Sequence, residues 1–381
     1  MTRPITVMPD EPAATGRLFA LPDDRSGVRD HLSAVDTLLS GTLETLSGRW
    51  TDLVDGWPPD VLGDADIPQL LADLLASGGK RIRPTMAYLG WAAGGGARRE
   101  GSRQQVVTVG AALELLHLFA LVHDDVMDES DSRRGVPTVH RRAGRRHAAV
   151  GAAGDPELFG TSIAILAGDL ALAEAEGLIA ETTPVLRRLW RHLVVELVVG
   201  QRQDLTGTAA RRRDLAFARS VAILKSGRYT VQRPLELGAT AAEAPDAVRR
   251  RLSRYGRHLG EAFALRDDLL GVWGDPARTG KPAGDDLITG KPTVLLSIAV
   301  DRTRSPAARG ALDRVGTPAF GEPDLALLLD ELSANGTRSG VEQMIGHEAE
   351  AALAALDDPA LDPDAADELR RLARRIAWRE R

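Results

Sequence analysis

The sequence has no cysteine, few aromatic residues and no excess of positive charge. None of the 381 residues is cysteine, and Phe, Trp and Tyr together make up 4%. The absence of thiols excludes disulfide frameworks, cysteine nucleophiles, zinc ribbons and iron–sulfur clusters. A formal net charge of -6 argues against a general nucleic-acid-binding protein, which needs a net basic face. The 43% of hydrophobic residues is enough to build one large core.

Long uninterrupted apolar runs are also missing. Residues 1–30 contain scattered Pro, Asp and Arg instead of the basic start and apolar stretch of a secretory signal, so we expect a cytoplasmic protein. The longest apolar stretch, at residues 106–122, is shorter than the roughly 20 residues that span a bilayer and contains Glu114 and His117. We therefore expect a buried helix there and no integral membrane association.

Apolar residues recur with a helical period almost throughout the chain after residue 28. No segment alternates with period two for long enough to predict a strand. The breaks, rich in Gly, Pro and Ser, are short, so the sequence predicts one all-α domain at residues 29–381 after a mobile tail at residues 1–28. The predicted helical segments are 29–47, 67–93, 104–130, 160–181, 185–205, 211–239, 244–273, 290–301, 323–333, 339–356 and 364–379.

An acidic cluster, DDVMD, occupies residues 124–128 at the end of the most apolar segment. On an ideal helix Asp124 and Asp128 lie within about 40° of each other, and His117 lies within about 20° of Asp124. Carboxylates at the C-terminal end of a helix repel one another and oppose the helix dipole, so a cation is expected beside them. Mg²⁺ commonly joins such carboxylates to substrate phosphates. Taken alone, the motif also fits an acidic, solvated helix end.

A second acidic pair, Asp267 and Asp268, also follows an apolar helical segment. The spacing places Asp267 on the inner face of its helix if Phe263 is buried. Two acidic clusters on facing helices of a bundle can hold metal ions between them.

Basic residues accompany both acidic clusters. Lys80, Arg81 and Arg83 follow a pair of glycines at a predicted helix start, where backbone N–H groups and the helix dipole already favour an anion. Each basic side chain alone fits a solvated surface charge, and only their occurrence beside two acidic motifs indicates a site. Further basic residues come from several segments: Arg133, Arg134, Lys225, Lys281 and Lys291.

Five ordered motifs resemble those of the all-trans isoprenyl diphosphate synthases, also called polyprenyl synthetases. They are GGKRIRP at 78–84, ELLHLFALVHDDVMDESDSRRGVPTVH at 114–140, GQRQDL at 200–205, KSGRYTVQRPLELG at 225–238 and AFALRDDLLGVWGDPARTGKPAGDDLITGKPTVL at 262–295. Their order and spacing match the family over roughly residues 30–380. The resemblance implies an all-α, single-domain helical bundle with a central active-site cavity. It also implies a homodimer that binds isoprenoid diphosphates and no nucleic acid.

The resemblance also implies roles for individual residues. Those matching contacts to isopentenyl diphosphate are Lys80, Arg83, His117 and Arg134. Those matching contacts to the allylic diphosphate are Arg133, Lys225, Ser226, Lys281 and Lys291, while Gln201 and Asp204 line the site. The matching Mg²⁺ ligands are Asp124, Asp128 and Asp267 for three expected ions, with Asp125 beside them and Asp268 supporting bound waters. These five aspartates and Lys225 form the expected catalytic set.

The sequence departs from the family pattern at three positions. Gly271 stands where many members have a third Asp, which we expect to weaken the hydration of the third ion without abolishing its site. Ala264 replaces the usual Gln and removes one donor to the allylic group. Ser226 replaces Thr and keeps the hydroxyl group. No expected metal ligand is lost, so the resemblance still implies catalysis.

The implied reaction ionises an allylic diphosphate, condenses the cation with isopentenyl diphosphate and eliminates a proton. Phe119 and Ala120 precede Asp124 by five and four residues, and one aromatic with a small neighbour resembles geranylgeranyl diphosphate (C20) synthases. Paired aromatics suit C15 products, and the two extra residues of bacterial-type C15 motifs are absent, so farnesyl diphosphate synthesis is the alternative. Ideal geometry places Phe119 about 140° from the Asp124 face, so this assignment rests on the resemblance.

Two other protein classes compete with this interpretation. A class I terpene cyclase also uses DDxxD and Mg²⁺, but its second metal motif begins with Asn, and the only Asn here is Asn335. A non-catalytic synthase subunit generally lacks one acidic motif, and both remain. The basic run at residues 133–147 holds no aromatic residue for base stacking, so we expect its second half to be a solvated loop.

Overall fold

The computed structural model describes residues 26–58, 60–133, 136–274 and 283–378. Within these ranges the only strands are β1 (Ser132–Arg133) and β2 (Val136–Pro137), paired antiparallel, so the all-α prediction is confirmed. The helices are α1 (Ser26–Val54), η2 (Gly63–Ala65), α2 (Ile67–Ala76), α3 (Ile82–Ala93), η3 (Gly96–Arg98), α4 (Ser102–Met127), α5 (Val139–Ala149), α6 (Pro156–Ala180), α7 (Pro184–Ala209), α8 (Leu215–Val221), η4 (Ala222–Gln232), α9 (Arg233–Ala241), α10 (Asp246–Trp273), α12 (Asp285–Thr289), α13 (Val294–Arg302), α14 (Pro306–Arg314), α15 (Glu322–Ala334), α16 (Thr337–Ala354) and α17 (Pro363–Trp378).

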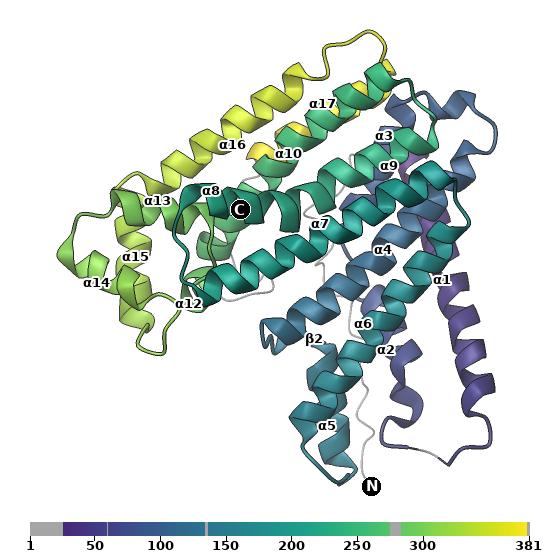
Figure 1. Ribbon diagram of the computed structural model, residues 1–381, viewed down its shortest axis with the longest axis horizontal. Helices are drawn as coiled ribbons and strands as arrows, with labels where there is room; N and C mark the ends of the chain where they lie inside the picture. The colour runs from purple at the N-terminus through teal and green to yellow at the C-terminus, as the bar shows by residue number, and fades with distance from the viewer. Residues whose placement is uncertain (1–25, 59, 134–135, 275–282, 379–381) are drawn as a thin grey trace, which may run out of the picture.

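Helix α4 lies at the centre of the bundle, as its apolar sequence predicts. It packs against α1, α3, α6 and α9, and Figure 1 shows it running beside α6 toward the short hairpin. The helix is long and apolar enough to cross a membrane, yet 72% of its most apolar window is buried inside the protein. Neighbouring helices of the same chain therefore cover the apolar surface of α4.

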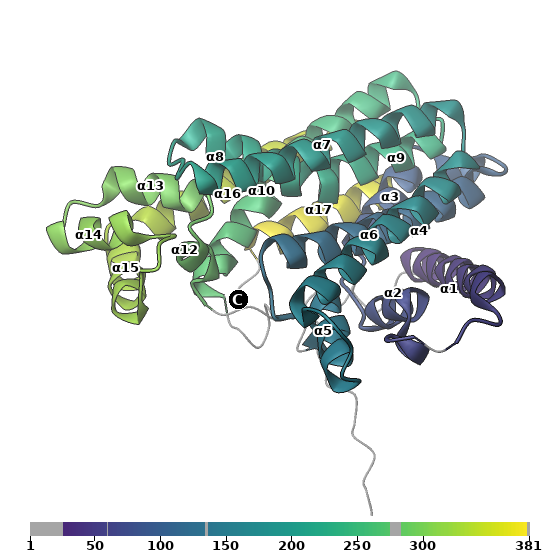
Figure 2. The same cartoon turned by 60° about the horizontal axis from the view of Figure 1, so that its bottom comes forward.

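Three apolar clusters place the remaining helices. One surrounds α4 with α1, α2, α6 and α7; a second joins α3, α9, α10 and α17; the third joins α10 to α13–α16. Figure 2 shows α13–α15 at one end of the molecule and α1 and α2 at the other. Helix α10 contributes side chains to the second and third clusters, and the second acidic pair lies between its residues Leu265 and Leu269 of the third cluster.

Glycines allow the helices around the active site to approach closely. A Cβ on Gly200 of α7 would lie 2.5 Å from the backbone nitrogen of Lys225, and one on Gly227 would lie 2.7 Å from the carbonyl oxygen of Gly260 in α10. The segment between these contacts, η4, is a π-helix, a conformation that often occurs at functional sites. Close packing on both sides fixes the position of the lysine that η4 carries.

Two predictions about secondary structure were wrong. The segment 67–93 is broken between α2 and α3, because Gly78 and Arg81 adopt positive φ angles of 80° and 47°. The second half of the basic run at 133–147 is helix α5 and not a solvated loop, because Val139, Ala143 and His147 form a buried stripe on the helix, which packs on α6. Most of the predicted tail at 1–28 lies outside the described residues, and its last three residues begin α1.

Candidate active site

The two acidic clusters line the same cavity, although they lie far apart in the sequence. Asp124 comes from α4 and the pair Asp267 and Asp268 comes from α10, and all three border a cavity of about 370 Å³. A larger groove of about 1060 Å³ between α1, α4 and α6 contains none of these carboxylates. The cavity between α4 and α10 is therefore the candidate active site.

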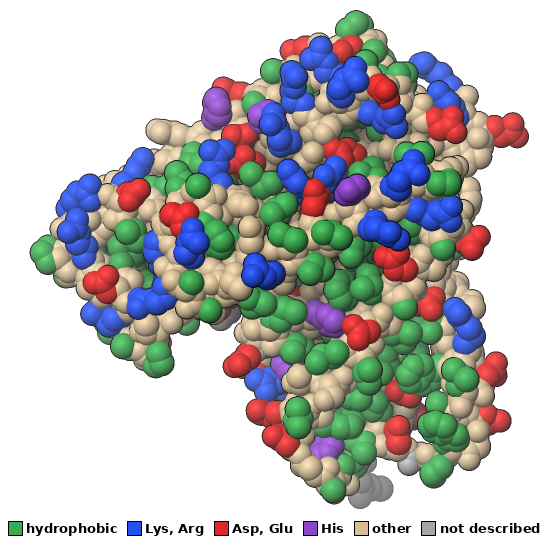
Figure 3. Space-filling model, viewed as in Figure 1, with side chains coloured by type: hydrophobic (Ala, Val, Ile, Leu, Met, Phe, Trp, Pro, Cys, Tyr) green, Lys and Arg blue, Asp and Glu red, His purple; other side chains and the backbone are tan. Residues whose placement is uncertain are grey.

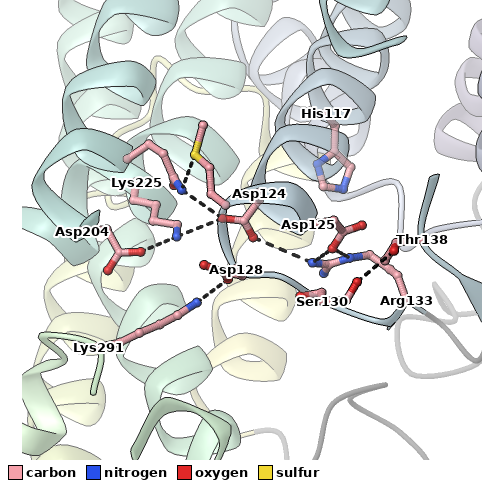
Figure 4. A network of polar contacts seen from close by, with 12 residues as sticks. His117, Asp124, Asp125, Asp128, Ser130, Arg133, Thr138, Asp204, Lys225 and Lys291 are labelled. Carbon is pink, nitrogen blue, oxygen red and sulfur yellow. Dashed lines mark hydrogen bonds and ion pairs between the residues drawn. The ribbon is translucent and has the colours of Figure 1, made fainter. Parts of the chain in front are cut away.

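Two lysines pair with carboxylates of the first acidic cluster, as Figure 4 shows. Nζ of Lys225 lies 3.2 Å from Oδ1 of Asp124 and 2.5 Å from Oδ2 of Asp204 on α7. Nζ of Lys291 lies 2.6 Å from Oδ2 of Asp128, the residue that caps α4. Three segments distant in the sequence therefore converge on the end of α4 through charge pairs.

Both lysines remain charged despite their burial. Burial alone would lower the pKa of Lys225, but Asp124 and Asp204 outweigh that effect and raise the pKa. The pKa of Lys291 is also raised, because Asp128 is among several carboxylates that outweigh its burial. The ammonium groups therefore neutralise part of the negative charge around the cavity.

The distribution of lysine in the chain supports this site. Lys and Arg together number 48, yet only four are lysines, at positions 80, 225, 281 and 291. The three that the structure describes, Lys80, Lys225 and Lys291, all line the cavity. Arg supplies every other basic charge of the described residues, so in that part of the chain the compact ammonium group occurs only at this cavity.

The middle carboxylate of the first motif faces a different partner. Asp125 is only 4% exposed, and its Oδ1 accepts a 2.7 Å hydrogen bond from Nε of Arg133 on β1. Arg133 also reaches toward Asp124, at 3.8 Å. Asp125 therefore holds the arginine that follows the motif beside Asp124. Gln201 on α7 donates to Oδ1 of Asp124 at 3.1 Å.

A residue outside the two acidic motifs joins the second cluster. Asp286, from α12, lines the cavity with Asp267 and Asp268 and lies beside Gly271. Burial raises the pKa of Asp268 well above its usual range, and the nearby carboxylates of Asp286 and Asp267 add to this effect. The backbone N–H of Val294 donates to the Asp268 carboxylate and opposes the rise only in part. This end of the cavity therefore concentrates negative charge that a cation would relieve.

A second group of predicted residues meets two turns before Asp124, on the same face of α4. Nδ1 of His117 lies 3.1 Å from the hydroxyl of Tyr229 on η4, and the guanidinium carbon of Arg83 on α3 lies 4.0 Å from the centre of the Tyr229 ring. Arg83 also donates to Thr230 at 3.1 Å. Lys80, in the loop before α3, lines the main cavity.

Not all predicted residues lie at the cavity. Arg134 and Lys281 fall outside the described residues. Phe119 and Ala120 are absent from the cavity lining, and the Phe119 ring packs edge-on against His123, 4.7 Å between centroids, on the side of α4 toward α6. Ser226 does line the cavity. Sequence reasoning missed Tyr229 and Asp286, although both lie inside quoted motifs.

The donors around the cavity fit Mg²⁺. Among the described residues, no three His, Asp or Glu side chains are gathered closely enough to hold a metal ion by themselves. Mg²⁺ usually keeps several waters and takes one or two carboxylates together with phosphate oxygens, so it does not require a closed protein cage. The open set of carboxylate oxygens, with no thiolate in the chain, matches this preference.

Comparisons with known proteins agree with this chemistry. Residues 65–317 match the family model for polyprenyl synthetase. A geranylgeranyl diphosphate synthase of Mycobacterium tuberculosis is 34% identical over 301 residues, covering 76% of this chain and 77% of the relative. A geranylfarnesyl diphosphate synthase of Aeropyrum pernix is 33% identical, covering 70% and 78%. The crystal structure of a Corynebacterium glutamicum geranylgeranyl pyrophosphate synthase, complexed with isoprenyl diphosphate and magnesium, superposes with a TM-score of 0.84 at 36% identity and covers 93% of this chain and 100% of its own.

Proposed function

The chain belongs to the polyprenyl synthetase family, and from that premise we propose that it makes geranylgeranyl diphosphate from isopentenyl diphosphate and an allylic diphosphate. Membership makes it a Mg²⁺-dependent trans-prenyltransferase. One observation carries the proposal: Asp124 and Asp267, from the two acidic motifs, border a single cavity together with lysines.

The charge balance of the cavity supports binding of a diphosphate together with metal ions. Five aspartates and three lysines line it, so the lining is net negative. A diphosphate adds roughly three negative charges, which the lysines alone cannot neutralise. We propose three Mg²⁺ ions, with Asp124, Asp128 and Asp267 as their protein ligands. When bound, these ions stabilise the negative charge that develops on the leaving diphosphate.

The residues of this chain divide between two substrates. Lys225, Lys291 and Arg133, which now pair with Asp124, Asp128 and Asp125, are placed to turn toward the allylic diphosphate. Arg83 and His117, two turns earlier along α4, together with Lys80 are proposed to bind the diphosphate of isopentenyl diphosphate. Holding the two substrates side by side supplies the proximity that a bimolecular condensation needs.

The apolar part of the lining protects the reaction from water. Apolar residues border the cavity as well as charged ones: Ala218, Val221, Ala222, Leu270 and Pro292. The allylic carbon loses its diphosphate, the double bond of isopentenyl diphosphate attacks the cation, and a proton leaves to the released diphosphate. Exclusion of water by these side chains prevents capture of the cation as an alcohol.

Product length depends on where the growing chain is stopped. We propose that Phe119 forms this stop, because its ring is held in place by His123, whose Nε2 lies 3.1 Å from the carbonyl oxygen of Ile165 in α6. A single aromatic with the small Ala120 beside it supports C20 products. Farnesyl diphosphate remains the second candidate product.

A homodimer is the proposed assembly. Figure 3 shows hydrophobic side chains over α6 and α7 on the face toward the viewer. Leu166 of α6 is 53% exposed, and Val195 and Val198 of α7 are 56% and 53% exposed. A second copy that buried this face would remove its apolar surface from water.

A cytoplasmic location remains a prediction.

The proposal is tested by incubating the purified protein with labelled isopentenyl diphosphate, Mg²⁺ and dimethylallyl, geranyl or farnesyl diphosphate in turn. We expect a C20 diphosphate as the main product by chromatography after dephosphorylation. A C15 main product would support the second candidate, and a cyclic hydrocarbon would establish a cyclase. No product with any primer would identify a non-catalytic subunit.

A further inference from the structure

Tyr229 is a buried residue of η4 that contacts two predicted substrate-binding residues from different helices. Its side chain is 4% exposed, and its hydroxyl lies 3.1 Å from Nδ1 of His117 on α4. The face of its ring lies 4.0 Å from the guanidinium carbon of Arg83 on α3. One side chain therefore links groups carried by three helices.

Helices η4 and α4 meet at two points, one at Lys225 and one at Tyr229. His117 and Asp124 are two turns apart on one face of α4, roughly 10 Å along its axis. Asp124 faces Lys225, and His117 faces Tyr229, four residues further along η4. The two helices therefore run in opposite directions here, and each contact lies at the site proposed for one diphosphate.

The hydrogen bond to Tyr229 determines how His117 can meet an anion. Burial raises the pKa of Tyr229 above its usual range, despite the opposing effect of Arg83, so the phenol keeps its proton. The phenol can therefore donate its O–H to Nδ1 of His117, and a neutral imidazole that accepts this hydrogen bond carries its own hydrogen on Nε2. The nitrogen away from Tyr229 then becomes the donor for a phosphate oxygen.

The same ring also restricts Arg83. A guanidinium stacked on an aromatic face is attracted by the ring and held in one plane. Its Nη2 donates to Thr230, while its Nε has no hydrogen-bond partner among the described residues. A buried N–H without a partner is costly, and a phosphate oxygen would satisfy it.

We propose that Tyr229 is a positioning residue for isopentenyl diphosphate, fixing the Nε2–H form of His117 through its hydroxyl and the plane of Arg83 through its ring. This inference rests on the proposed function, which gives His117 and Arg83 their substrate. Tyr229 acts through its two neighbours and need not touch the reacting atoms.

The central test is Tyr229→Phe, which removes the hydroxyl and keeps the ring. We expect KM for isopentenyl diphosphate to rise about five- to tenfold, as expected for one lost hydrogen bond, with kcat and KM for the allylic substrate changed less than about twofold. Tyr255→Phe is the matched control, because Tyr255 is also a fully buried tyrosine, and its hydroxyl donates to the carbonyl of Leu369 away from the cavity. An unchanged KM in Tyr229→Phe, or an equal rise in Tyr255→Phe, would overturn the proposal.

A double-mutant comparison separates positioning from general loosening of the fold. In a His117→Ala background, Tyr229→Phe should raise KM by less than twofold, because the hydroxyl has lost the group it orients. Tyr229→Leu should weaken binding more than Tyr229→Phe, because Arg83 loses the ring face as well. Full additivity of Tyr229→Phe with His117→Ala contradicts the proposal.

A spectroscopic readout keeps this inference distinct from the proposed function. The ¹⁵N resonances of His117, assigned with His117→Gln, report which ring nitrogen carries the proton. We expect protonated Nε2 and unprotonated Nδ1 in the native protein at neutral pH, and a mixture of tautomers in Tyr229→Phe. The same tautomer in both proteins would refute the positioning role even in an active enzyme. A native protein with the expected tautomer and no synthase activity would instead refute only the proposed function.

Discussion

The carboxylate of Asp286 occupies the space that a side chain at position 271 would need. A Cβ on Gly271 would lie 2.0 Å from Oδ2 of Asp286, far inside van der Waals contact. Position 271 is the place where the motif of many family members has a third Asp. In this chain the carboxylate of Asp286, from α12, takes up that space. This end of the cavity therefore still has three carboxylates, those of Asp267, Asp268 and Asp286.

The first prediction follows from this replacement. Gly271→Asp should lower kcat/KM about tenfold or more, because the new side chain displaces Asp286 and adds a charge beside Asp268. Asp286→Ala should raise the Mg²⁺ concentration needed for half-maximal activity. The double variant Gly271→Asp/Asp286→Ala should recover most of the activity of the native enzyme. Calorimetric titration with Mg²⁺ and inorganic pyrophosphate checks the binding effect separately, and a double variant worse than either single one contradicts the replacement.

The lysine content leads to a second prediction. Lys225→Arg should lower kcat about 10- to 100-fold, because the larger planar group cannot sit between Asp124 and Asp204 as the ammonium does. Arg202→Lys, an exposed position on α7, is the matched exchange and should leave kcat unchanged. Steady-state kinetics with saturating Mg²⁺ distinguish the two. Equal activity of Lys225→Arg and the native enzyme would show that only positive charge matters there.

The elements that the sequence predicts well are those with a local signal. The apolar period of α4 and the acid clusters at the ends of α4 and α10 are continuous patterns, so their helices and faces follow from spacing alone. The buried stripe of α5 is equally local, and the loop predicted there was wrong because Val139, Ala143 and His147 recur every four residues, which is the spacing of a helix face.

The relationships that sequence reasoning missed depend on tertiary packing. Nothing in the spacing of Gly271 and Asp286 indicates that they meet, because the turn from α10 to α12 sets their distance. Tyr229 faces His117 only because η4 is a π-helix packed closely on α7 and α10 through Gly200 and Gly227. A helical wheel drawn for an ordinary α-helix would misplace Tyr229 relative to Lys225.

A third prediction concerns stability in acid. His31 is completely buried in α1, and burial, helped by the charge of Arg103, lowers its pKa from 6.5 to about 4. As the pH falls below 6.5, His31 binds a proton in the unfolded chain but not in the folded one. The contribution of neutral His31 to the free energy of unfolding is therefore complete above pH 6.5 and is lost as the pH falls toward 4. The free energy of unfolding should drop by about 3 kcal/mol over that range. Urea denaturation of the native protein and His31→Met at pH 7.5 and pH 5 checks this, because the variant should lack this part of the acid dependence.

A fourth prediction concerns the assembly. Val198→Glu on α7 should convert the homodimer to monomers, because a charge in an apolar interface cannot be paired. Val300→Glu on α13, a valine that is 39% exposed on another element, is the control and should leave the mass unchanged. Sedimentation of both variants and the native protein gives the answer. A native protein that sediments as a monomer would rule out the proposed interface directly.

The last prediction concerns the length of the product. Phe119→Ala should shift the main product beyond C20, because removal of the ring opens space along α4 where the chain end is proposed to stop. Phe159→Ala is the matched control, since Phe159 also stacks on a histidine, His147, 4.8 Å between centroids, away from the cavity. Both variants lose a similar aromatic contact and should lose comparable stability, so only a change in prenyl length separates them. Chromatography of the dephosphorylated products makes the comparison, and an unchanged C20 profile in Phe119→Ala would move the stop to another residue. The outcome decides between the resemblance, which places Phe119 at the end of the chain, and ideal helix geometry, which turns it about 140° from the Asp124 face.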